Sequence, residues 1–305
     1  MVVVTGAFGY IGKYITRALL DQGKRVRTIT THPEKSNPFG SSVDAFQYDF
    51  DKPELLVKHL KGAHTLYNTY WVRFPYDGLT FEDAIRNTEI LFSSARTAGI
   101  RKIVHISVTN ASTDSPLPYY SGKGRQELLL ASSGLNYSIV RPTLVFGKED
   151  ILVNNIGWLI RHFPLFPIFG NGKYRLQPVF VGDLARIAVD AATLSSGTVV
   201  DAIGPETYTF NDFISLIVTK LRAKCRPVHV SPKFGIACGR IIGLMVGDVV
   251  LTSNELRGLM DNYLTSDQIP NGETRFAEWL EENRDHLGTE YSSEIQRHFR
   301  WRHIS

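Results

Sequence analysis

The chain has little cysteine, little net charge and no long uninterrupted apolar run, and each shortage excludes a class of protein. Two cysteines in 305 residues, Cys225 and Cys238, are too few for a disulfide framework or a zinc cluster. We expect both to be reduced thiols in a reducing compartment. The 34 basic and 30 acidic residues give a net charge of +4, which is too small to indicate nucleic acid as a partner.

The longest apolar stretch, residues 234–251, is interrupted by Arg240 and Asp248. Its glycines recur every four residues, a spacing that would indicate close helix packing in a membrane. The two charges instead favour a tightly packed helix of a soluble protein, so we expect no membrane span. Met1 is followed directly by three valines without a charged leader, which predicts no targeting segment and a cytoplasmic protein.

Short apolar runs alternate with amphipathic stretches through the first half of the chain. The runs predict strands at 2–5, 25–30, 45–48, 64–68, 102–107 and 136–140, and the stretches predict helices at 12–22, 53–60, 81–98 and 123–132. Parallel strands need helical crossovers between them. The alternation therefore predicts an α/β fold with a doubly wound parallel sheet.

The second half departs from this pattern. Residues 163–172, FPLFPIFGNG, are rich in proline and glycine and are predicted to form no regular element. Later elements are predicted as a helix at 183–194, a strand at 198–203 and helices at 275–283 and 292–299. We expect the chain to be mostly helical after residue 204.

A glycine-rich turn, TGAFGYIG at residues 5–12, lies where the first strand meets the first helix. Gly6 permits the tight turn, Gly9 lets backbone amides approach a pyrophosphate, and Gly12 lets the helix pack on the strand. The helix N-terminus adds partial positive charge. The residues predicted to bind a dinucleotide here are Thr5, Gly6, Phe8, Gly9, Tyr10, Ile11 and Gly12.

The glycine-rich turn indicates which part of the chain binds the dinucleotide and, by difference, which part binds the substrate. Residues 1–142 plus 178–203 are predicted to form a dinucleotide-binding Rossmann domain. Residues 143–177 plus 204–305 are predicted to form a smaller, mostly helical C-terminal substrate subdomain, or cap.

The chain resembles the short-chain dehydrogenase/reductase superfamily, in the extended or atypical branch that includes nucleotide-sugar epimerases and NmrA-like proteins. The matching motifs are the glycine loop, Tyr48-Asp49-Phe50, Tyr119-x3-Lys123 with Glu127, Arg141-Pro142-Thr143-x3-Gly147 and the run from Pro178 to Ala185. The run after Phe163, together with the loop, is most similar to the subgroup containing the Rossmann-fold accessory subunit of respiratory complex I. The last hundred or so residues match no family that we name.

Tyr119 and Lys123 have the spacing of a catalytic pair. A tyrosine with its ordinary pKa is a poor base at neutral pH, and a lysine four residues later lies on the same helical face and lowers that pKa. The resemblance makes Tyr119 the acid/base and Lys123 its activator and ribose partner. It also asks for a hydroxyl after the fifth strand, for which Thr109 is preferred over Ser107. Asn110 and Ala111 replace the acidic pair of sugar dehydratases, which disfavours water elimination.

The cofactor is predicted to be NADP or NAD, with NADP slightly favoured. The second strand ends in Thr30-Thr31-His32, and no carboxylate follows until Glu34. The acidic residue with which NAD-specific relatives bind the ribose is therefore missing. Beyond the glycine loop, the expected cofactor contacts are Thr30, Thr31, His32, Asp49, Phe50, Tyr70, Lys123 and Pro142; in the family, the aspartate contacts the adenine amino group.

Two features of the sequence are open to more than one interpretation. Five aromatic residues cluster after the fourth strand: Tyr67, Tyr70, Trp71, Phe74 and Tyr76. They could line a substrate pocket or, equally, belong to the core or anchor a loop. The basic, aromatic tail at 297–303 could contact an acidic partner or lipid headgroups, but a solvated helix end is favoured. No side chains have the spacing of a metal site.

The sequence supports two functions. The first is an NAD(P)-dependent oxidoreductase or epimerase acting on a hydroxyl or carbonyl of a small molecule, such as a nucleotide sugar. The alternative is a non-catalytic NAD(P)-binding sensor or scaffold, as the resemblance to NmrA-like proteins and the complex I subunit implies. The first is favoured because a scaffold has no need to keep Tyr119, Lys123 and a nearby hydroxyl together. We expect a monomer or homodimer.

Overall fold

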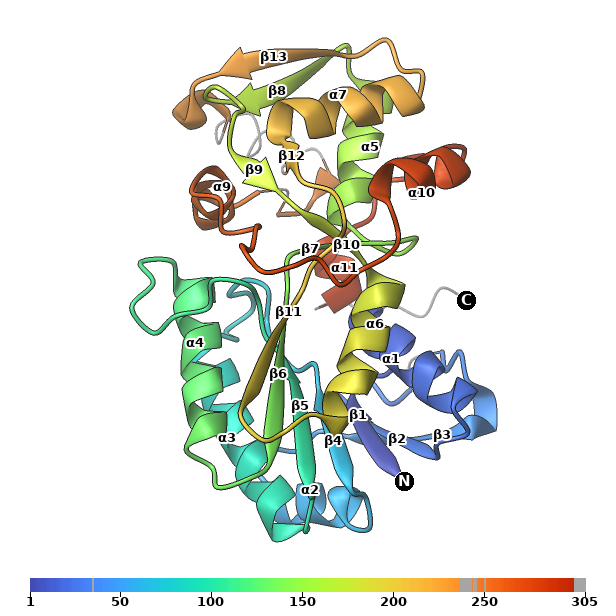
Figure 1. Ribbon diagram of the computed structural model, residues 1–305, viewed down its shortest axis with the longest axis vertical. Helices are drawn as coiled ribbons and strands as arrows, with labels where there is room; N and C mark the ends of the chain where they lie inside the picture. The colour runs from blue at the N-terminus through green and yellow to red at the C-terminus, as the bar shows by residue number, and fades with distance from the viewer. Residues whose placement is uncertain (35, 236–242, 244–245, 250, 299–305) are drawn as a thin grey trace. The chain divides into compact units, whose positions relative to one another are not determined.

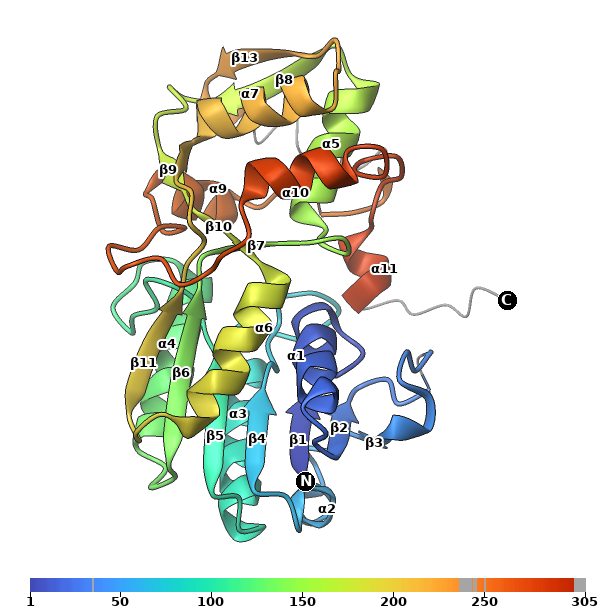
Figure 2. The same cartoon turned by 45° about the vertical axis from the view of Figure 1, so that its right-hand side comes forward.

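The computed structural model describes residues 1–34, 36–235, 243, 246–249 and 251–298. It divides into two compact units (Figures 1 and 2). The first comprises Met1–Pro142 and Val181–Ala202, and the second comprises Thr143–Phe180 and Ile203–Ser305. Each unit is described by itself.

The first unit is a seven-stranded parallel sheet in the order β11-β6-β5-β4-β1-β2-β3. Its strands are β1 (Val2–Thr5), β2 (Val26–Thr30), β3 (Val43–Gln47), β4 (Thr65–Asn68), β5 (Lys102–Ile106), β6 (Tyr137–Pro142) and β11 (Thr198–Ala202). Its helices are α1 (Tyr10–Asp21), α2 (Pro53–Leu60), α3 (Phe81–Thr97), α4 (Pro118–Ala131) and α6 (Val181–Asp190). The predicted doubly wound α/β fold is confirmed.

Helices cover both faces of this sheet (Figures 1 and 2). Helices α1 and α6 pack together on one face, while α3 packs between α2 and α4 on the other. All residues of β1, β4 and β5 are buried, as expected for parallel strands covered on both sides. The chain leaves neighbouring strands β1 and β4 toward opposite faces, so the crevice at their carboxyl ends is a topological switch point.

Helix α4 begins earlier than the predicted residues 123–132. It starts at Pro118, in the first turn, where the missing N–H of proline costs no helical hydrogen bond. The correction matters for function because it puts Tyr119 and Lys123 one turn apart on the same helix.

In the part of the chain that the structure describes, the second unit combines helices with three two-stranded sheets. The helices are α5 (Leu152–His162), α7 (Phe210–Lys220), α9 (Ser253–Met260), α10 (Phe276–Asn283) and α11 (Glu294–His298). The paired strands are β7 (Leu144–Phe146) with β10 (Pro178–Phe180), β8 (Leu165–Phe169) with β13 (Arg226–Val230), and β9 (Arg175–Leu176) with β12 (Tyr208–Thr209). Its core is aromatic, with Phe146, Phe213 and Phe276 fully buried beside Trp279.

The prediction that residues 163–172 form no regular element is wrong. Residues Leu165–Phe169 form β8, which pairs in parallel with β13. Pro167 is tolerated because β8 has a neighbour on one side only within its two-stranded sheet, so one edge needs no backbone donor. Burial of Phe166 and Ile168 supplies the driving force that composition alone conceals.

Several sequence expectations fall partly or wholly outside the described residues. The glycine-spaced segment 234–251 is described only in part, and neither Cys238 nor residues 299–303 of the basic tail are described. Cys225 is a buried free thiol.

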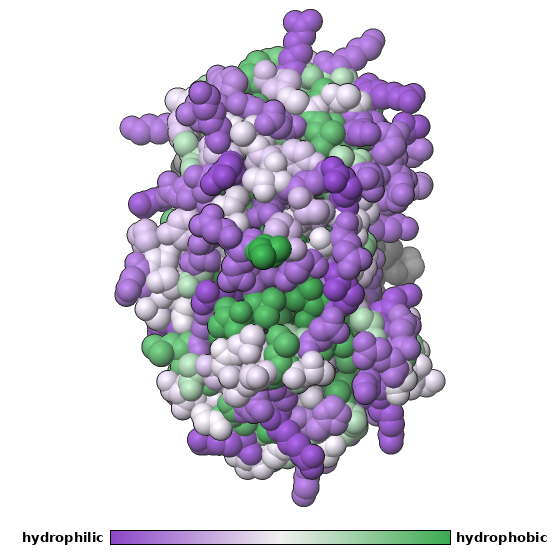
Figure 3. Space-filling view, viewed as in Figure 1, coloured by the Kyte–Doolittle hydropathy of each residue, from purple (hydrophilic) through white to green (hydrophobic). Residues whose placement is uncertain are grey.

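Most of the surface on the face in Figure 3 is hydrophilic, with apolar side chains gathered in one area. Among the described residues, large side chains such as Leu128 and Phe234 remain exposed. No described helix combines the length and apolar character that a membrane crossing requires.

Candidate functional site

The glycine loop depends on the backbone conformation of Gly6 and on two close approaches to its carbonyl oxygen. Gly6 has a φ of 64°, a conformation that favours glycine, and its carbonyl oxygen accepts a hydrogen bond from the Gly9 N–H at 2.8 Å. A Cβ on Gly12 would lie 2.2 Å from that same oxygen. The loop therefore needs glycine at both 6 and 12, as the sequence pattern implies.

Helix α1 begins directly after this loop. Gly9 is its N-cap and makes no side-chain capping bond, and no acidic residue occupies the first turn. The partial positive charge of the helix N-terminus is thus not offset by the protein's own carboxylates there. This arrangement suits a pyrophosphate at the carboxyl end of β1.

A buried polar network joins the ends of β1, β4 and β5. The Thr5 hydroxyl accepts from the Thr69 N–H at 2.7 Å and lies 3.2 Å from the Asn68 side-chain oxygen. The Asn68 Nδ2 donates to His105 Nδ1 at 3.0 Å. Burial holds the pKa of His105 well below its usual range, so the ring is neutral. Thr5 thus fixes the shape of the switch point from inside the protein.

The sequence reasoning did not single out Asn68 or His105. The available signal was a polar residue near the end of each of two neighbouring strands, Asn68 in β4 and His105 in β5. A buried polar side chain needs a partner, and adjacent parallel strands can supply one.

The expected adenine side lies at the ends of β2 and β3. The Thr30 hydroxyl accepts from the His32 N–H at 3.3 Å, and His32 Nδ1 lies 3.2 Å from a Glu34 carboxylate oxygen. Asp49 accepts from the Lys52 N–H at 3.1 Å, and its other oxygen lies 3.5 Å from the Lys52 ammonium. Asp49 therefore shapes the turn into α2, and its expected contact with adenine stays a prediction.

Aromatic rings surround this end of the sheet. Tyr48 stacks on Phe50 with ring centroids 4.9 Å apart, and Tyr70 packs against both at 5.3 Å. The Tyr70 hydroxyl accepts a hydrogen bond from Asn87 at 2.9 Å. The alternative of loop anchoring thus fits Tyr70, and Tyr67 and Phe74 are buried in the first unit.

Helix α4 brings Tyr119 and Lys123 to the carboxyl end of β5. Tyr119 is half-buried, whereas Lys123 is only 3% exposed and its ammonium donates to the Ile106 carbonyl oxygen at 3.0 Å. Burial lowers the pKa of Lys123 to about 7, an effect partly opposed by Glu127. Tyr120, one residue out of register, is buried, as the helical geometry requires.

Glycines on either side of Lys123 let other segments approach the helix. A Cβ on Gly122 would lie 2.6 Å from the Trp71 ring, and a Cβ on Gly124 would lie 2.4 Å from the backbone of Ser112. Trp71 and the loop around Ser112 thus both lie close against α4 beside the lysine. The two glycines in the sequence Ser-Gly-Lys-Gly indicate that other segments pack closely on the helix here, but the sequence does not say which segments these are.

Ser107 and Thr109 differ in their hydrogen-bond partners. The Ser107 hydroxyl donates to a Glu127 carboxylate oxygen at 2.5 Å, and Glu127 forms a two-point ion pair with Arg141. The Ser107 proton is therefore committed to the carboxylate, which leaves the oxygen as an acceptor. The Thr109 backbone N–H donates to the Pro142 carbonyl at 3.1 Å, and its hydroxyl lies 3.4 Å from that oxygen.

These contacts assemble most of the predicted site residues along one edge of one sheet. The glycine loop follows β1, Tyr70 and Trp71 follow β4, and Ser107 and Thr109 follow β5. Among the described residues, no group of three His, Cys, Asp or Glu side chains could hold a metal ion.

Comparison with known proteins agrees with this geometry. Residues 6–151 match the family described as NAD(P)H-binding. Subunit 9 of the NADH dehydrogenase [ubiquinone] 1 alpha subcomplex, mitochondrial, from Dictyostelium discoideum is 24% identical over 230 residues, covering 70% of this chain and 62% of that protein. The chain thus spans about three-fifths of the length of the curated relatives that it matches first.

Two solved structures share the fold over nearly the whole chain. An NADPH-dependent quinone oxidoreductase from Escherichia coli, complexed with NADPH, superposes with a TM-score of 0.76 at 19% identity, covering 94% of this chain and 99% of that one. A nucleoside-diphosphate-sugar epimerase from Staphylococcus aureus gives a TM-score of 0.72 at 18% identity, covering 98% and 99%. At these identities the likeness shows the fold alone.

Proposed function

Residues 6–151 of this chain belong to the NAD(P)H-binding family, and from that premise we propose that the protein is an NAD(P)-dependent oxidoreductase or epimerase acting on a small-molecule carbonyl or hydroxyl. The observation that carries the proposal is the placement of Lys123. Its buried ammonium lies at the end of β5, one helical turn from the half-buried Tyr119. Solved structures of the same fold include a quinone oxidoreductase and a sugar epimerase.

In this proposal the dinucleotide lies along the carboxyl edge of the sheet. The glycine loop and the α1 N-terminus would hold the pyrophosphate, and Asp49 would face the adenine. When bound, the nicotinamide supplies the hydride. Tyr119 would transfer the proton at the reacting oxygen, and the Lys123 ammonium would lower the pKa of that phenol and hold the ribose hydroxyls.

The two hydroxyls after β5 take different roles. Because the Ser107 proton is given to Glu127, Ser107 is a poor donor to a substrate oxygen. We therefore assign the polarising role to Thr109, whose hydroxyl also lies after β5, 3.4 Å from the Pro142 carbonyl oxygen. This agrees with the preference for Thr109 that the sequence suggested.

The test combines binding with turnover. We expect NADPH, NADH or both to bind in calorimetry, and a carbonyl or quinone screen read by cofactor fluorescence to find a substrate. Tyr119→Phe should then lower turnover by roughly 10²–10⁴-fold while leaving cofactor affinity unchanged, because only the proton donor is lost. Absence of binding at millimolar cofactor, or full activity in Tyr119→Phe, would refute the proposal.

A second function, a dinucleotide-binding scaffold without turnover, is favoured by one observation. The face of the Trp71 ring lies 4.8 Å from the Lys123 ammonium, so part of the space beside the lysine is already filled. The complex I subunit among the relatives fits this alternative. A scaffold would bind the dinucleotide and gain thermal stability from it, yet reduce nothing in the screen.

The cofactor choice follows from the end of β2. NADP remains slightly favoured because no carboxylate immediately follows the strand, but the contact between His32 and Glu34 brings one close. Parallel titrations with NADPH and NADH decide between the two.

A further inference from the structure

Trp71 is seated on helix α4 at a position that only glycine allows. A Cβ on Gly122 would lie 2.6 Å from Cη2 and 3.1 Å from Cζ2 of the indole. Real Cβ atoms essentially never lie within 3.0 Å of such a neighbour, so the 2.6 Å approach means that any side chain at 122 would move the ring. The indole therefore contacts the bare backbone of α4.

Stacking holds the ring from its other sides. Phe81, the first residue of α3, lies parallel to it with centroids 5.5 Å apart and an interplanar angle of 10°. Tyr119 meets Trp71 edge-on at 5.9 Å. The indole Nε1 is buried and has no hydrogen-bond partner among the described residues, so packing rather than a polar contact fixes the ring.

The ring face held in this way is directed at a buried charge. The Lys123 ammonium lies 4.8 Å from the ring centroid and donates to the Ile106 carbonyl oxygen. An ammonium removed from water needs compensating negative potential, and the face of an indole supplies it best among the aromatic side chains.

Titratable groups on three elements surround this ammonium. On α4, Glu127 raises the pKa of Lys123, although its carboxylate is shared with Ser107 and paired with Arg141 of β6. On β5, His105 is neutral. Tyr119, one turn before the lysine, contacts the same indole edge-on. The contacts of the ammonium itself are to the Trp71 indole and the Ile106 carbonyl oxygen.

We propose that Trp71 is a positioning residue for Lys123: its indole, seated on Gly122 and backed by Phe81, holds the lysine ammonium at the end of β5 in its charged form, ready for the nicotinamide ribose. Binding of the nicotinamide ribose by Lys123 rests on the proposed function, but the contact between Trp71 and Lys123 does not depend on it. The Gly-Lys-Gly sequence and the tryptophan after β4 thus act together to position the lysine ammonium.

The first test measures Lys123 itself, without any ligand. Trp71→Phe keeps an aromatic face, whereas Trp71→Leu introduces a side chain of about the size of phenylalanine that has no aromatic face. With isotope-labelled lysine, NMR titration should give Lys123 a midpoint about half a pH unit or more higher in the Phe variant than in the Leu variant, as a cation–π contact predicts. Equal midpoints in two folded variants would overturn the proposal.

The second test uses the cofactor and a fragment of it. NADPH and NADH carry the nicotinamide ribose, and ADP does not. Trp71→Leu should weaken binding of the preferred dinucleotide about fivefold or more and leave ADP affinity unchanged, while Trp71→Phe stays closer to the wild type. Equal losses for ADP and the dinucleotide would mean a general structural effect and would count against a role at Lys123.

Gly122→Ala provides an independent route to the same state, because its Cβ displaces the indole while Trp71 remains. It should reproduce Trp71→Leu in both tests, and Leu128→Ala, an exposed position on the same helix, should match the wild type. If the wild type binds the dinucleotide and Lys123→Met weakens it but the Trp71 and Gly122 variants do not, the inference fails and the proposed function stands. If no dinucleotide binds the wild type, the proposed function fails, and the NMR titration still decides whether Trp71 positions Lys123.

Discussion

Lys123 shows how one buried side chain can carry both a functional and a stability signature. Its ammonium has one carbonyl partner and one aromatic face, and burial lowers its pKa from the ordinary 10.5 to about 7. A lysine on the surface would have no such shift. The site therefore holds a group that changes charge near neutral pH, as general acid–base chemistry requires.

The same shift predicts how stability depends on pH. Between about pH 7 and pH 10.5 the unfolded chain binds a proton at Lys123 that the folded chain does not, so folding becomes more favourable as pH rises through this window. Below pH 7 both states carry the proton, and the burial penalty is constant.

Urea unfolding of the wild type and of Lys123→Met at several pH values measures this effect. Relative to the variant, the wild type should gain up to about 1.4 kcal/mol per pH unit between pH 7 and pH 9. A difference between the two proteins that does not change with pH would contradict the low pKa of Lys123.

Ser107 illustrates that a candidate residue is defined by where its proton goes. The sequence offered two candidate hydroxyls two residues apart, Ser107 and Thr109, with Thr109 preferred. The pairing of Glu127 with Arg141 turns Ser107 into a donor toward the protein interior, which separates the two roles.

At the scale of elements, the junction of β1 and α1 separates packing glycines from ligand-binding ones. The Cβ of residue 12 would meet the Gly6 carbonyl at 2.2 Å, whereas the Cβ of residue 9 would meet it at 3.1 Å, which a small shift can relieve. Gly12 is thus needed for the helix to approach the strand, whereas we propose that Gly9 lets a ligand approach the helix.

Two substitutions test this division. Gly12→Ala should lower the free energy of unfolding by about 1–3 kcal/mol, because overpacking forces α1 away from β1. Gly9→Leu should remain folded, with a far smaller stability loss, yet lose dinucleotide binding in calorimetry. If Gly9→Leu bound the dinucleotide as tightly as the wild type, the placement of the pyrophosphate at this loop would be wrong.

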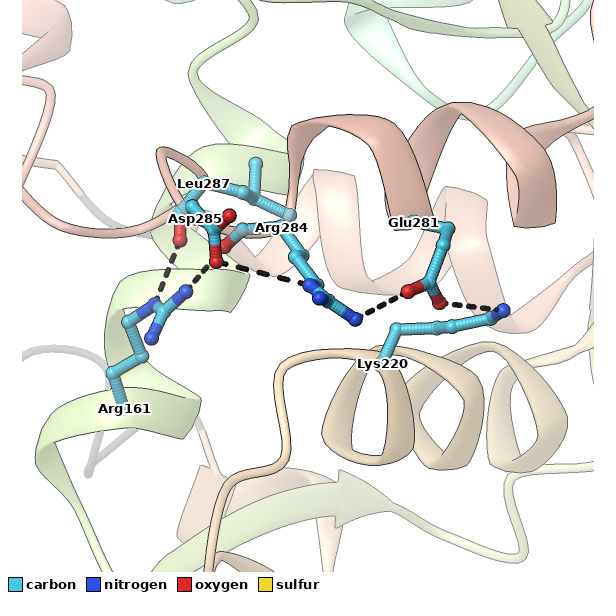
Figure 4. A network of polar contacts seen from close by, with 6 residues as sticks. All are labelled: Arg161, Lys220, Glu281, Arg284, Asp285 and Leu287. Atoms are coloured by element: carbon cyan, nitrogen blue, oxygen red, sulfur yellow. Dashed lines mark hydrogen bonds and ion pairs between the residues drawn. The ribbon is translucent and has the colours of Figure 1, made fainter.

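At the scale of the whole molecule, each unit has its own means of holding its helices together. In the second unit Arg161 of α5 donates to the carbonyl oxygens of Leu287 and Arg284, beyond the end of α10 (Figure 4). Glu281 of α10 meets Arg284 and, at 2.9 Å, Lys220 of α7. Three helices distant in sequence are thereby tied around the aromatic core.

The two ends of this network should contribute unequally. Arg161→Leu removes charged donors from two backbone carbonyls and should lower the stability of the second unit by about 1–3 kcal/mol. Lys220→Met breaks only a solvent-exposed ion pair and should cost less than about 1 kcal/mol. Denaturant unfolding followed by tryptophan fluorescence compares them, and equal losses would show that the carbonyl contacts add nothing.

Features that depend on short stretches of chain could be predicted from the sequence without the structure. Alternating apolar runs and amphipathic stretches gave the parallel sheet because backbone periodicity and burial repeat locally. The glycine loop was recognisable because a positive φ at Gly6 and a close approach at Gly12 are needs of one turn. The spacing of Tyr119 and Lys123 followed from a single helical turn.

The contacts that those residues make could be known from the tertiary structure alone. Trp71 meets Lys123 because the segment after β4 folds onto α4, and no local pattern encodes which distant segment will arrive. β8 exists because β13 pairs with it and a core buries Phe166, although Pro167 argues against a strand. The proton of Ser107 is directed to Glu127 because packing of α4 on the sheet brings the carboxylate within 2.5 Å. Contacts between segments far apart in the chain depend on how whole elements pack, and packing is a property of the assembled core rather than of any window of sequence.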